Sequence, residues 1–374
     1  MSRQAVRHAT PVDLAPAMQR DQLKSAHIRD VVLQAGEDLR TRHPWLRRQD
    51  QIGASILLLS VAAMAALAWA YTQGLVAWWA CIPLTAFFAS FIHELEHDLI
   101  HQMYFRHRPW VNRLMMAVGW LARPNAVNPF VRRALHLHHH KYSGTASDLE
   151  ERGIANGSRW GLGRLLGTID NPLGLLLRLR DVTESERLYK AMQQPTTGWQ
   201  RWALRHQQHL VYFPMGLLYY PPLYLWAGWH AWQWLAPQFG LNTAGAAPSE
   251  AWRHGMALLD TYAVVMLLPN TLRGFCLYFL SSNLHYYGDI DSRNVIQQCQ
   301  VLNAWWLWPF QLFCCNFGST HAIHHFAVKE PFYVRQWTAP VAHAAMRDAG
   351  VRFNDMGTFL RANRWGPTTL QRAH

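Results

Sequence analysis

The chain begins with a polar, basic stretch and then becomes free of charge. Residues 51–92 contain no Asp, Glu, Lys or Arg, and Gln73 and Gly74 divide this run into two pieces. Each piece is about long enough to cross ~30 Å of hydrocarbon at 1.5 Å per residue. Tryptophans, which favour the membrane–water interface, lie near the shared end of the two pieces: Trp69, Trp78 and Trp79. The pattern predicts a helical hairpin in a membrane.

Two further apolar segments follow a long polar region. Residues 93–206 are rich in Arg and His, a second uncharged run then extends to residue 249, and an apolar run resumes at Met256. Asp260, Pro269 and Arg273 interrupt the last run, and we expect Arg273 to snorkel toward the helix end. We therefore predict an all-α integral membrane protein with about four transmembrane helices, near residues 52–72, 75–98, 208–235 and 256–281.

Positive charge predicts the orientation of these spans. The segments before the first span and between the second and third carry most of the Arg residues, so both should be cytoplasmic. Residues 72–75 and 236–255 then lie on the far side, and every histidine cluster lies in a cytoplasmic helical cap. We expect a basic arm at 1–50, a membrane domain at 51–330 and a cytoplasmic C-terminal segment at 331–374. Residues 160–180 interleave Leu with Arg and fit either an interfacial helix pair or a surface helix packed on the cap.

The composition supports a membrane protein. Half of the 374 residues are hydrophobic, only 16% are charged, and the chain has 19 Trp. The net charge of +12 indicates lipid head groups or an acidic redox partner rather than nucleic acid. None of the five cysteines forms a CxxC pair, so we expect neither a disulfide framework nor a sulfur-ligated metal.

Histidine clusters carry the candidate chemistry. The chain has 21 histidines, and they concentrate in HELEHDLIH at 93–101, HLHHH at 136–140 and HAIHH at 321–325. His93, His97 and His101 are spaced by four residues, which places them on one face of a helix. Neutral imidazole is a good ligand for iron and zinc, and these clusters hold too many imidazoles for one ion. The sequence therefore predicts two metal ions.

The order of the clusters resembles the histidine boxes of the membrane fatty acid desaturase and hydroxylase superfamily. HxxxH is followed about 40 residues later by HxxHH and then by a distant HxxHH. The resemblance implies four membrane helices, a cytoplasmic cap and a non-haem di-iron centre with two Fe ions. It implies core ligands at His93, His97, His136, His139, His140, His321, His324 and His325, with His101 as a possible extra ligand. His138 lies outside the HxxHH frame.

A further segment, SSNLHYYGD at 281–289, resembles an additional Asn/His motif of the same superfamily. The asparagine of that motif precedes the histidine by four residues, and Ser281 holds this place here. His285 therefore fits as a ninth ligand better than Asn283 fits as a ligand acting through water.

Carboxylates near the clusters are expected to orient the imidazoles. The candidates are Glu94, Asp98 and Asp148. For Glu150 and Glu151, a solvated surface role is an equally open interpretation.

The resemblance implies an oxidoreductase that uses O₂ to remove hydrogen from an unactivated C–H bond of a long acyl chain. We favour an acyl desaturase, and a hydroxylase of the same superfamily is the alternative. Electrons must come from a separate ferredoxin- or cytochrome-like donor, because the sequence has no GxGxxG nucleotide motif. A membrane zinc protease using HELEH, with Glu94 as base, is a remote alternative that leaves the other clusters unexplained.

Overall fold

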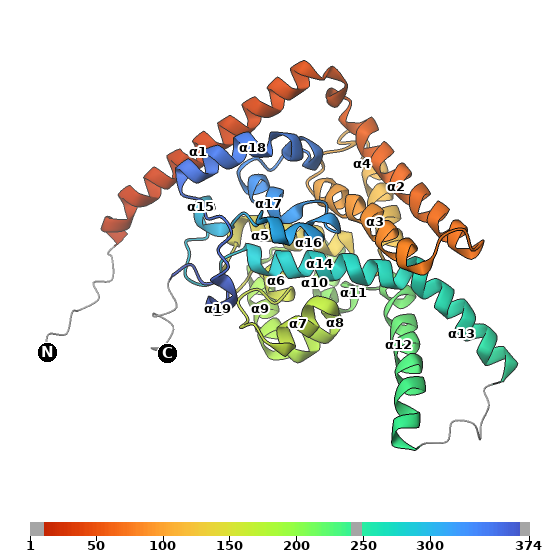
Figure 1. The fold of residues 1–374 in the computed structure, drawn as a ribbon. Helices are drawn as coiled ribbons and strands as arrows, with labels where there is room; N and C mark the ends of the chain where they lie inside the picture. The colour runs from red at the N-terminus through yellow and green to blue at the C-terminus, as the bar shows by residue number, and fades with distance from the viewer. Residues whose placement is uncertain (1–10, 241–248, 367–374) are drawn as a thin grey trace, which may run out of the picture.

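The computed structural model describes residues 11–240 and 249–366, and these residues are helical, without a named β-strand (Figure 1). Two isolated bridges, His285 with Cys299 and Val301 with Phe353, are the only strand-like pairings within the described ranges. The prediction of an all-α protein is confirmed.

The first apolar run forms the predicted hairpin. Helices α2 (Gln49–Thr72) and α3 (Trp78–Ile100) pack side by side (Figure 1). Gly74 allows the turn between them, because its φ of +71° lies in the left-handed region that favours glycine. Buried apolar side chains of both helices share one core, so packing and not helix propensity holds the pair together.

The polar region after α3 forms a series of short helices. They are α4 (Pro109–Ala122), α5 (Pro129–Tyr142), α6 (Leu149–Gly153), α7 (Leu162–Ile169), α8 (Asn171–Leu177), α9 (Leu179–Met192), α10 (Gly198–Arg205) and α11 (Gln207–Leu210). Asn128 caps α5 by accepting a hydrogen bond from the backbone N–H of Phe130. Leu162, Leu176 and Leu179 are exposed on α7–α9, which is compatible with either interpretation of residues 160–180.

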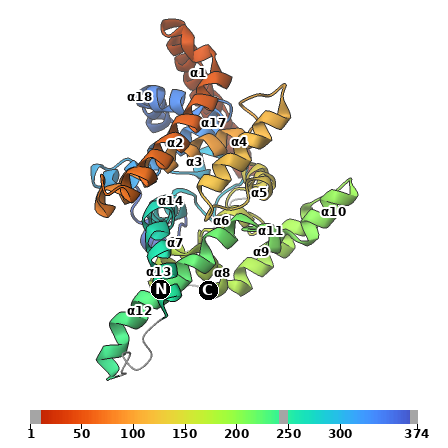
Figure 2. The ribbon, with the colours of Figure 1, turned by 90° about the vertical axis from the view of Figure 1, so that its right-hand side faces the viewer.

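The second apolar region forms a pair of helices that project from the body. They are α12 (Tyr220–Leu235) and α13 (Glu250–Tyr262), and a π-helical turn (Ala263–Leu267) joins α13 to α14 (Leu268–Leu284). Figures 1 and 2 both show α12 and α13 extending away from the other helices. Short 3₁₀ turns at Met215–Leu218 and Ala236–Phe239 flank α12.

Two helices of the described chain are long and apolar enough to cross a membrane, Gln49–Thr72 and Glu250–Leu284. They correspond to the first and fourth expected spans. The third expected span is shorter as a helix, since α12 has only 16 residues. Pro221 and Pro222 lie in its first turn, and Pro214 lies before it, so a regular helix does not extend back to residue 208. The four-span arrangement therefore remains a prediction, and part of the expected far-side segment, 241–248, lies outside the described residues.

The C-terminal part completes the core. It contains α15 (Val295–Gln298), a 3₁₀ turn (Trp305–Leu307), α16 (Trp308–Leu312), α17 (Phe317–Phe326), α18 (Phe332–Ala349) and α19 (Thr358–Arg361). The basic arm forms α1 (Pro11–Arg42) and a 3₁₀ turn (Pro44–Arg47), and α1 packs along α18 (Figure 1). Arg40 of α1 forms an ion pair of 2.7 Å with Glu330, which lies just before α18. The arm is thus docked on the C-terminal segment.

Candidate metal centre

Four stretches of chain, far apart in sequence, bring their histidines together. The C-terminal end of α3 meets α5, α17 and the residue that follows α14. Each stretch is held by local chemistry: the Asn128 cap fixes the start of α5, and the backbone carbonyl of His285 accepts hydrogen bonds from Asn156 (2.9 Å) and Asn363 (3.1 Å). The histidines separate into two groups.

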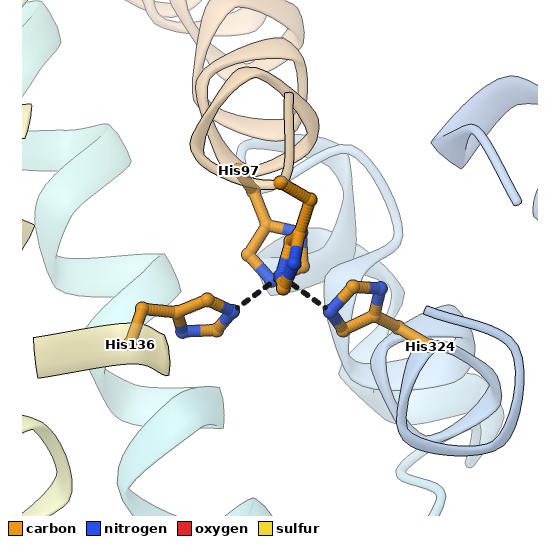
Figure 3. A group of neighbouring side chains, drawn as sticks. His97, His136 and His324 are labelled. Carbon is orange, nitrogen blue, oxygen red and sulfur yellow. Dashed lines mark hydrogen bonds between the residues drawn. The ribbon is translucent and has the colours of Figure 1, made fainter. Parts of the chain in front are cut away.

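The first histidine group comprises His97, His101, His136, His140 and His324. The Nε2 atom of His101 lies 3.0 Å from Nε2 of both His136 and His324. The Nε2 atom of His140 lies 3.1 Å from the same two atoms. A ring nitrogen of His97 lies within 4.8 Å of those of His101, His136 and His324. Figure 3 shows His136 and His324 pointing toward each other from opposite sides, with His97 above them.

The second histidine group comprises His139, His285, His321 and His325. The Nε2 atom of His285 lies 3.1 Å from that of His325 and 3.3 Å from that of His321, and the last two are 3.2 Å apart. A ring nitrogen of His139 lies within 4.8 Å of those of His285 and His325. All four side chains are buried.

Carboxylates contact the Nδ1 atom of several of these rings, while Nε2 faces the other histidines. Nδ1 of His136 donates to Glu150 Oε2 (2.8 Å), and Nδ1 of His139 donates to Asp148 Oδ2 (2.8 Å). A carboxylate only accepts, so the proton of a neutral ring is on Nδ1 and Nε2 keeps a free lone pair. Nδ1 of His285 also lies 3.1 Å from Glu151 Oε2. Three acidic residues between positions 148 and 151 thus lie beside imidazoles of both groups.

The inward-facing nitrogens fit metal ions. Several unprotonated Nε2 atoms around one point repel one another unless a cation lies between them, and His97 buries an Nε2 that has no hydrogen-bond partner. Burial lowers the pKa of His101 to about 4 and holds the pKa of His324 well below its usual range. Both rings are therefore neutral near pH 7, which is the form that binds metals.

His139 is a stronger base than the other rings. Burial lowers its pKa, but the adjacent Asp148 carboxylate outweighs that effect and raises the pKa of His139 to about 10. A carboxylate behind a histidine increases the basicity of the opposite nitrogen, and this is a common arrangement behind metal-bound histidines.

The three histidines of the first box do not all lie in the histidine groups. His93 lies outside both histidine groups: its Nε2 is buried without a hydrogen-bond partner, and its ring packs against Phe317. His97 and His101, the ends of HDLIH, are the members of this box that lie in the first group. The HELEH pair required by the zinc-protease alternative is therefore not brought together around one point.

The other polar residues predicted for the site have different surroundings. Asp98 accepts hydrogen bonds from Tyr104 (3.1 Å), the Phe332 N–H (2.9 Å) and Arg335 (3.1 Å), and so fixes the end of α3. Glu94 lies 3.6 Å from the same Arg335.

Asn283 and His138 also face away from the two groups. Asn283 accepts hydrogen bonds from Trp160 (2.9 Å) and Arg164 (3.3 Å) and donates to a backbone carbonyl. His138 is buried against Ser147 and Gln193.

The sequence pattern left the roles of Glu150 and Glu151 open and did not mark Gln298. The first two lie beside His136 and His285, and Gln298 Oε1 lies 3.1 Å from Nδ1 of His325. The acidic run SDLEE at 147–151, separated by six residues from the second histidine cluster, was the signal for the two glutamates. No pattern marked Gln298, because its position depends on the bridge between residues 285 and 299.

A cavity of about 290 Å³ opens beside both groups. His93, His136, His139 and His321 form part of its wall. Much of the remaining wall is apolar, with contributions from α5, α8, α9 and α14, including Leu135, Leu175, Val182 and Leu277. A substrate in this cavity would contact the histidine groups directly.

Comparison with known proteins agrees with this arrangement. Residues 73–357 match the family model described as fatty acid desaturase, a range that includes every histidine of the two groups. A search of curated proteins found no match. The family match covers well over half of the chain, and we conclude that the chain belongs to the fatty acid desaturase family.

Proposed function

We propose that the protein is a membrane-bound, O₂-dependent oxidase that introduces a double bond into a long acyl chain, and that its two histidine groups hold two iron ions. The main support is the convergence of nine imidazoles into two groups beside one cavity, whose wall includes His136, His139 and His321, in a chain of the fatty acid desaturase family. Imidazole suits iron, and five and four ligands are suitable numbers for two separate ions.

In this proposal, the first histidine group binds one ion and the second binds the other. When bound, the iron pair supplies the activation of O₂ and the removal of hydrogen from an unactivated C–H bond. Glu150 and Asp148 contact Nδ1 of His136 and His139, so these two rings are oriented with Nε2 toward the other histidines before a metal arrives.

The cavity wall would bind and align the substrate. Leu135, Leu175, Val182 and Leu277 can bury acyl methylenes at about 0.8 kcal/mol each, while they exclude water from the reacting carbon. Because His136, His139 and His321 share this wall, a bound chain passes both histidine groups.

The remaining elements of the proposal concern the surroundings of the site. Residues 51–330 form the membrane domain, with the histidine groups at the cytoplasmic face and the docked arm and C-terminal segment beside them. The basic balance of the chain suits an acidic electron donor, a ferredoxin- or cytochrome-like protein, docking at that face.

Hydroxylation is the second candidate, because both reactions begin by removing one hydrogen. Desaturation removes a second hydrogen from the neighbouring carbon, whereas hydroxylation returns oxygen to the first. Lipid profiling of a host that expresses the chain separates them. We expect new unsaturated chains that disappear in the His136→Ala variant; hydroxylated products would favour the alternative, and an unchanged profile with folded, iron-loaded protein would refute both.

A further inference from the structure

The cavity beside the histidines contains charged side chains, which is unusual for a site that receives only hydrocarbon. Most of these charges are matched. Glu96 pairs with Arg132 (3.1 Å) and also with Arg123, and Arg132 extends to Glu150 (3.2 Å). This buried chain of two arginines and two carboxylates is balanced in charge.

The other carboxylates of the wall are also occupied. Glu186 pairs with Lys190 (2.7 Å), and Glu151 accepts a hydrogen bond from Asn156 (3.1 Å) beside His285. None of these carboxylates lies within 4.0 Å of the remaining cation of the wall.

Arg273 is that remaining cation. It lines the cavity, and only 2% of its surface is exposed. It donates to the side-chain oxygens of Asn125 (2.8 Å) and Asn270 (3.4 Å), both neutral, and no carboxylate of the described chain lies within 4.0 Å of it. Burying an unpaired charge is costly. Ionisable residues of this kind within membrane helices commonly mark a substrate path. Arg273 does not snorkel to the helix end as its sequence position suggested.

Arg273 and His285 of the second histidine group lie at different positions along α14. Arg273, Leu277 and Ser281 all line it and follow one face of α14 at intervals of four residues. At 1.5 Å per residue, they cover about 12 Å along the helix. His285 of the second histidine group follows one turn later. A chain with its polar end at Arg273 would thus extend along α14 toward the histidines.

We propose that Arg273 binds the carboxylate of a free fatty acid and so fixes which carbon lies at the metal site. The inference rests on the proposed function, and it specifies the substrate as an acid and not an ester of an intact lipid. The oxidised position would then be set by its distance from the carboxyl end, and it would be the same for acids of different lengths.

The test compares binding of laurate and of dodecanol to the purified, iron-loaded protein in nanodiscs, with empty nanodiscs as the blank. We expect the wild-type protein to prefer laurate. In Arg273→Gln, laurate binding should weaken about 10–100-fold, the effect of losing a charge-assisted hydrogen bond, while dodecanol binding stays within about twofold. Arg273→Lys, which keeps the charge, should restore part of the preference.

Two matched variants distinguish a role of Arg273 in binding the carboxylate from a role in stabilising the fold. Leu277→Ala changes the same wall one turn away and should weaken both ligands alike. Asn125→Ala removes the closer of the two protein partners of Arg273 and should lower thermal stability while it keeps the preference for the acid. If Arg273 only supported the fold, Arg273→Gln and Asn125→Ala would both leave the ratio of acid to alcohol binding unchanged.

Other outcomes would also overturn the inference. Equal binding of laurate and dodecanol by the wild-type protein would refute a carboxylate-binding site. Tighter binding of dodecyl phosphate than of laurate would instead assign Arg273 to a phosphate head group. Neither result would affect iron content or the formation of unsaturated products. Failure of this inference is thus distinguishable from failure of the proposed function.

Discussion

Replacing Asp148 by asparagine removes the charge of a buried carboxylate while nearly keeping its shape. Asp148 is fully buried, and its Oδ2 accepts hydrogen bonds from His139 Nδ1 (2.8 Å) and the Gly144 N–H (3.1 Å). The asparagine oxygen can accept both bonds, so the fold should persist. What is lost is the negative charge that makes the opposite nitrogen of His139 basic.

Removing a carboxylate that accepts a hydrogen bond from a metal-bound histidine commonly lowers metal affinity 10–100-fold, which is about 1.4–2.7 kcal/mol. We expect Asp148→Asn to weaken the ion of the second histidine group by this amount and to leave the ion of the first group unchanged. Asp148→Ala should do more, because it leaves the His139 Nδ1–H and the Gly144 N–H buried without this partner, at about 1–3 kcal/mol each, and removes the N-cap of α6. That variant should also lose about 2–6 kcal/mol of folding stability.

The assay is iron titration of the purified variants, followed by elemental analysis and thermal unfolding. Asp260→Asn is a matched control, since Asp260 forms a similar 2.8 Å pair with His230 on the exposed surfaces of α12 and α13. The control should bind iron as the wild type does. Unchanged affinity for both ions in Asp148→Asn would refute the assignment of Asp148 to a metal-bound His139.

Three further predictions address the first box, a turn and the membrane topology. His101→Ala should reduce the iron content by one ion, whereas His93→Ala should retain both ions, because only His101 lies in a histidine group; equal losses in elemental analysis would contradict this difference. Gly144→Ala should destabilise the protein by at least about 1–2 kcal/mol in thermal unfolding, since its φ is +76° and a Cβ would lie 2.7 Å from a backbone carbonyl; an unchanged melting temperature would exclude this strain. Leu75→Cys, between α2 and α3, should react with a membrane-impermeant thiol reagent on the far side of intact membranes, whereas Trp45→Cys should react only after the membranes are opened. The reverse pattern would show that the topology is inverted.

Much of the site could be predicted from histidine spacing alone. The clusters at 136–140 and 321–325 lie on short helices, where spacing fixes which rings share a face. His285 could be placed as well, because it follows α14 directly and so emerges beside the other histidines.

The choice within the first box could not be made from sequence. HELEH and HDLIH both place two histidines one turn apart, so spacing cannot distinguish the pair His93–His97 from the pair His97–His101. The distinction depends on how far α3 extends before it meets α5 and α17. The structure places the two C-terminal members of the box at that point.

Burial also could not be read from the pattern of charges. Glu150 and Glu151 belong to a charged run that equally suits a solvated surface, and only the loop before α6 turns them toward the histidines. Arg273 interrupts an apolar run, but its lack of a carboxylate partner is a property of the packed helices. Between residues 208 and 235, the pattern of apolar residues likewise did not show that the regular helix begins only at Tyr220.

The central claim is that the two histidine groups hold two iron ions. Elemental analysis of the purified protein, with iron and zinc measured together against protein concentration, tests it most directly. We expect about two iron ions per chain and little zinc, as the nine grouped imidazoles suit. One zinc ion per chain and no iron, after expression with both metals supplied, would contradict the account.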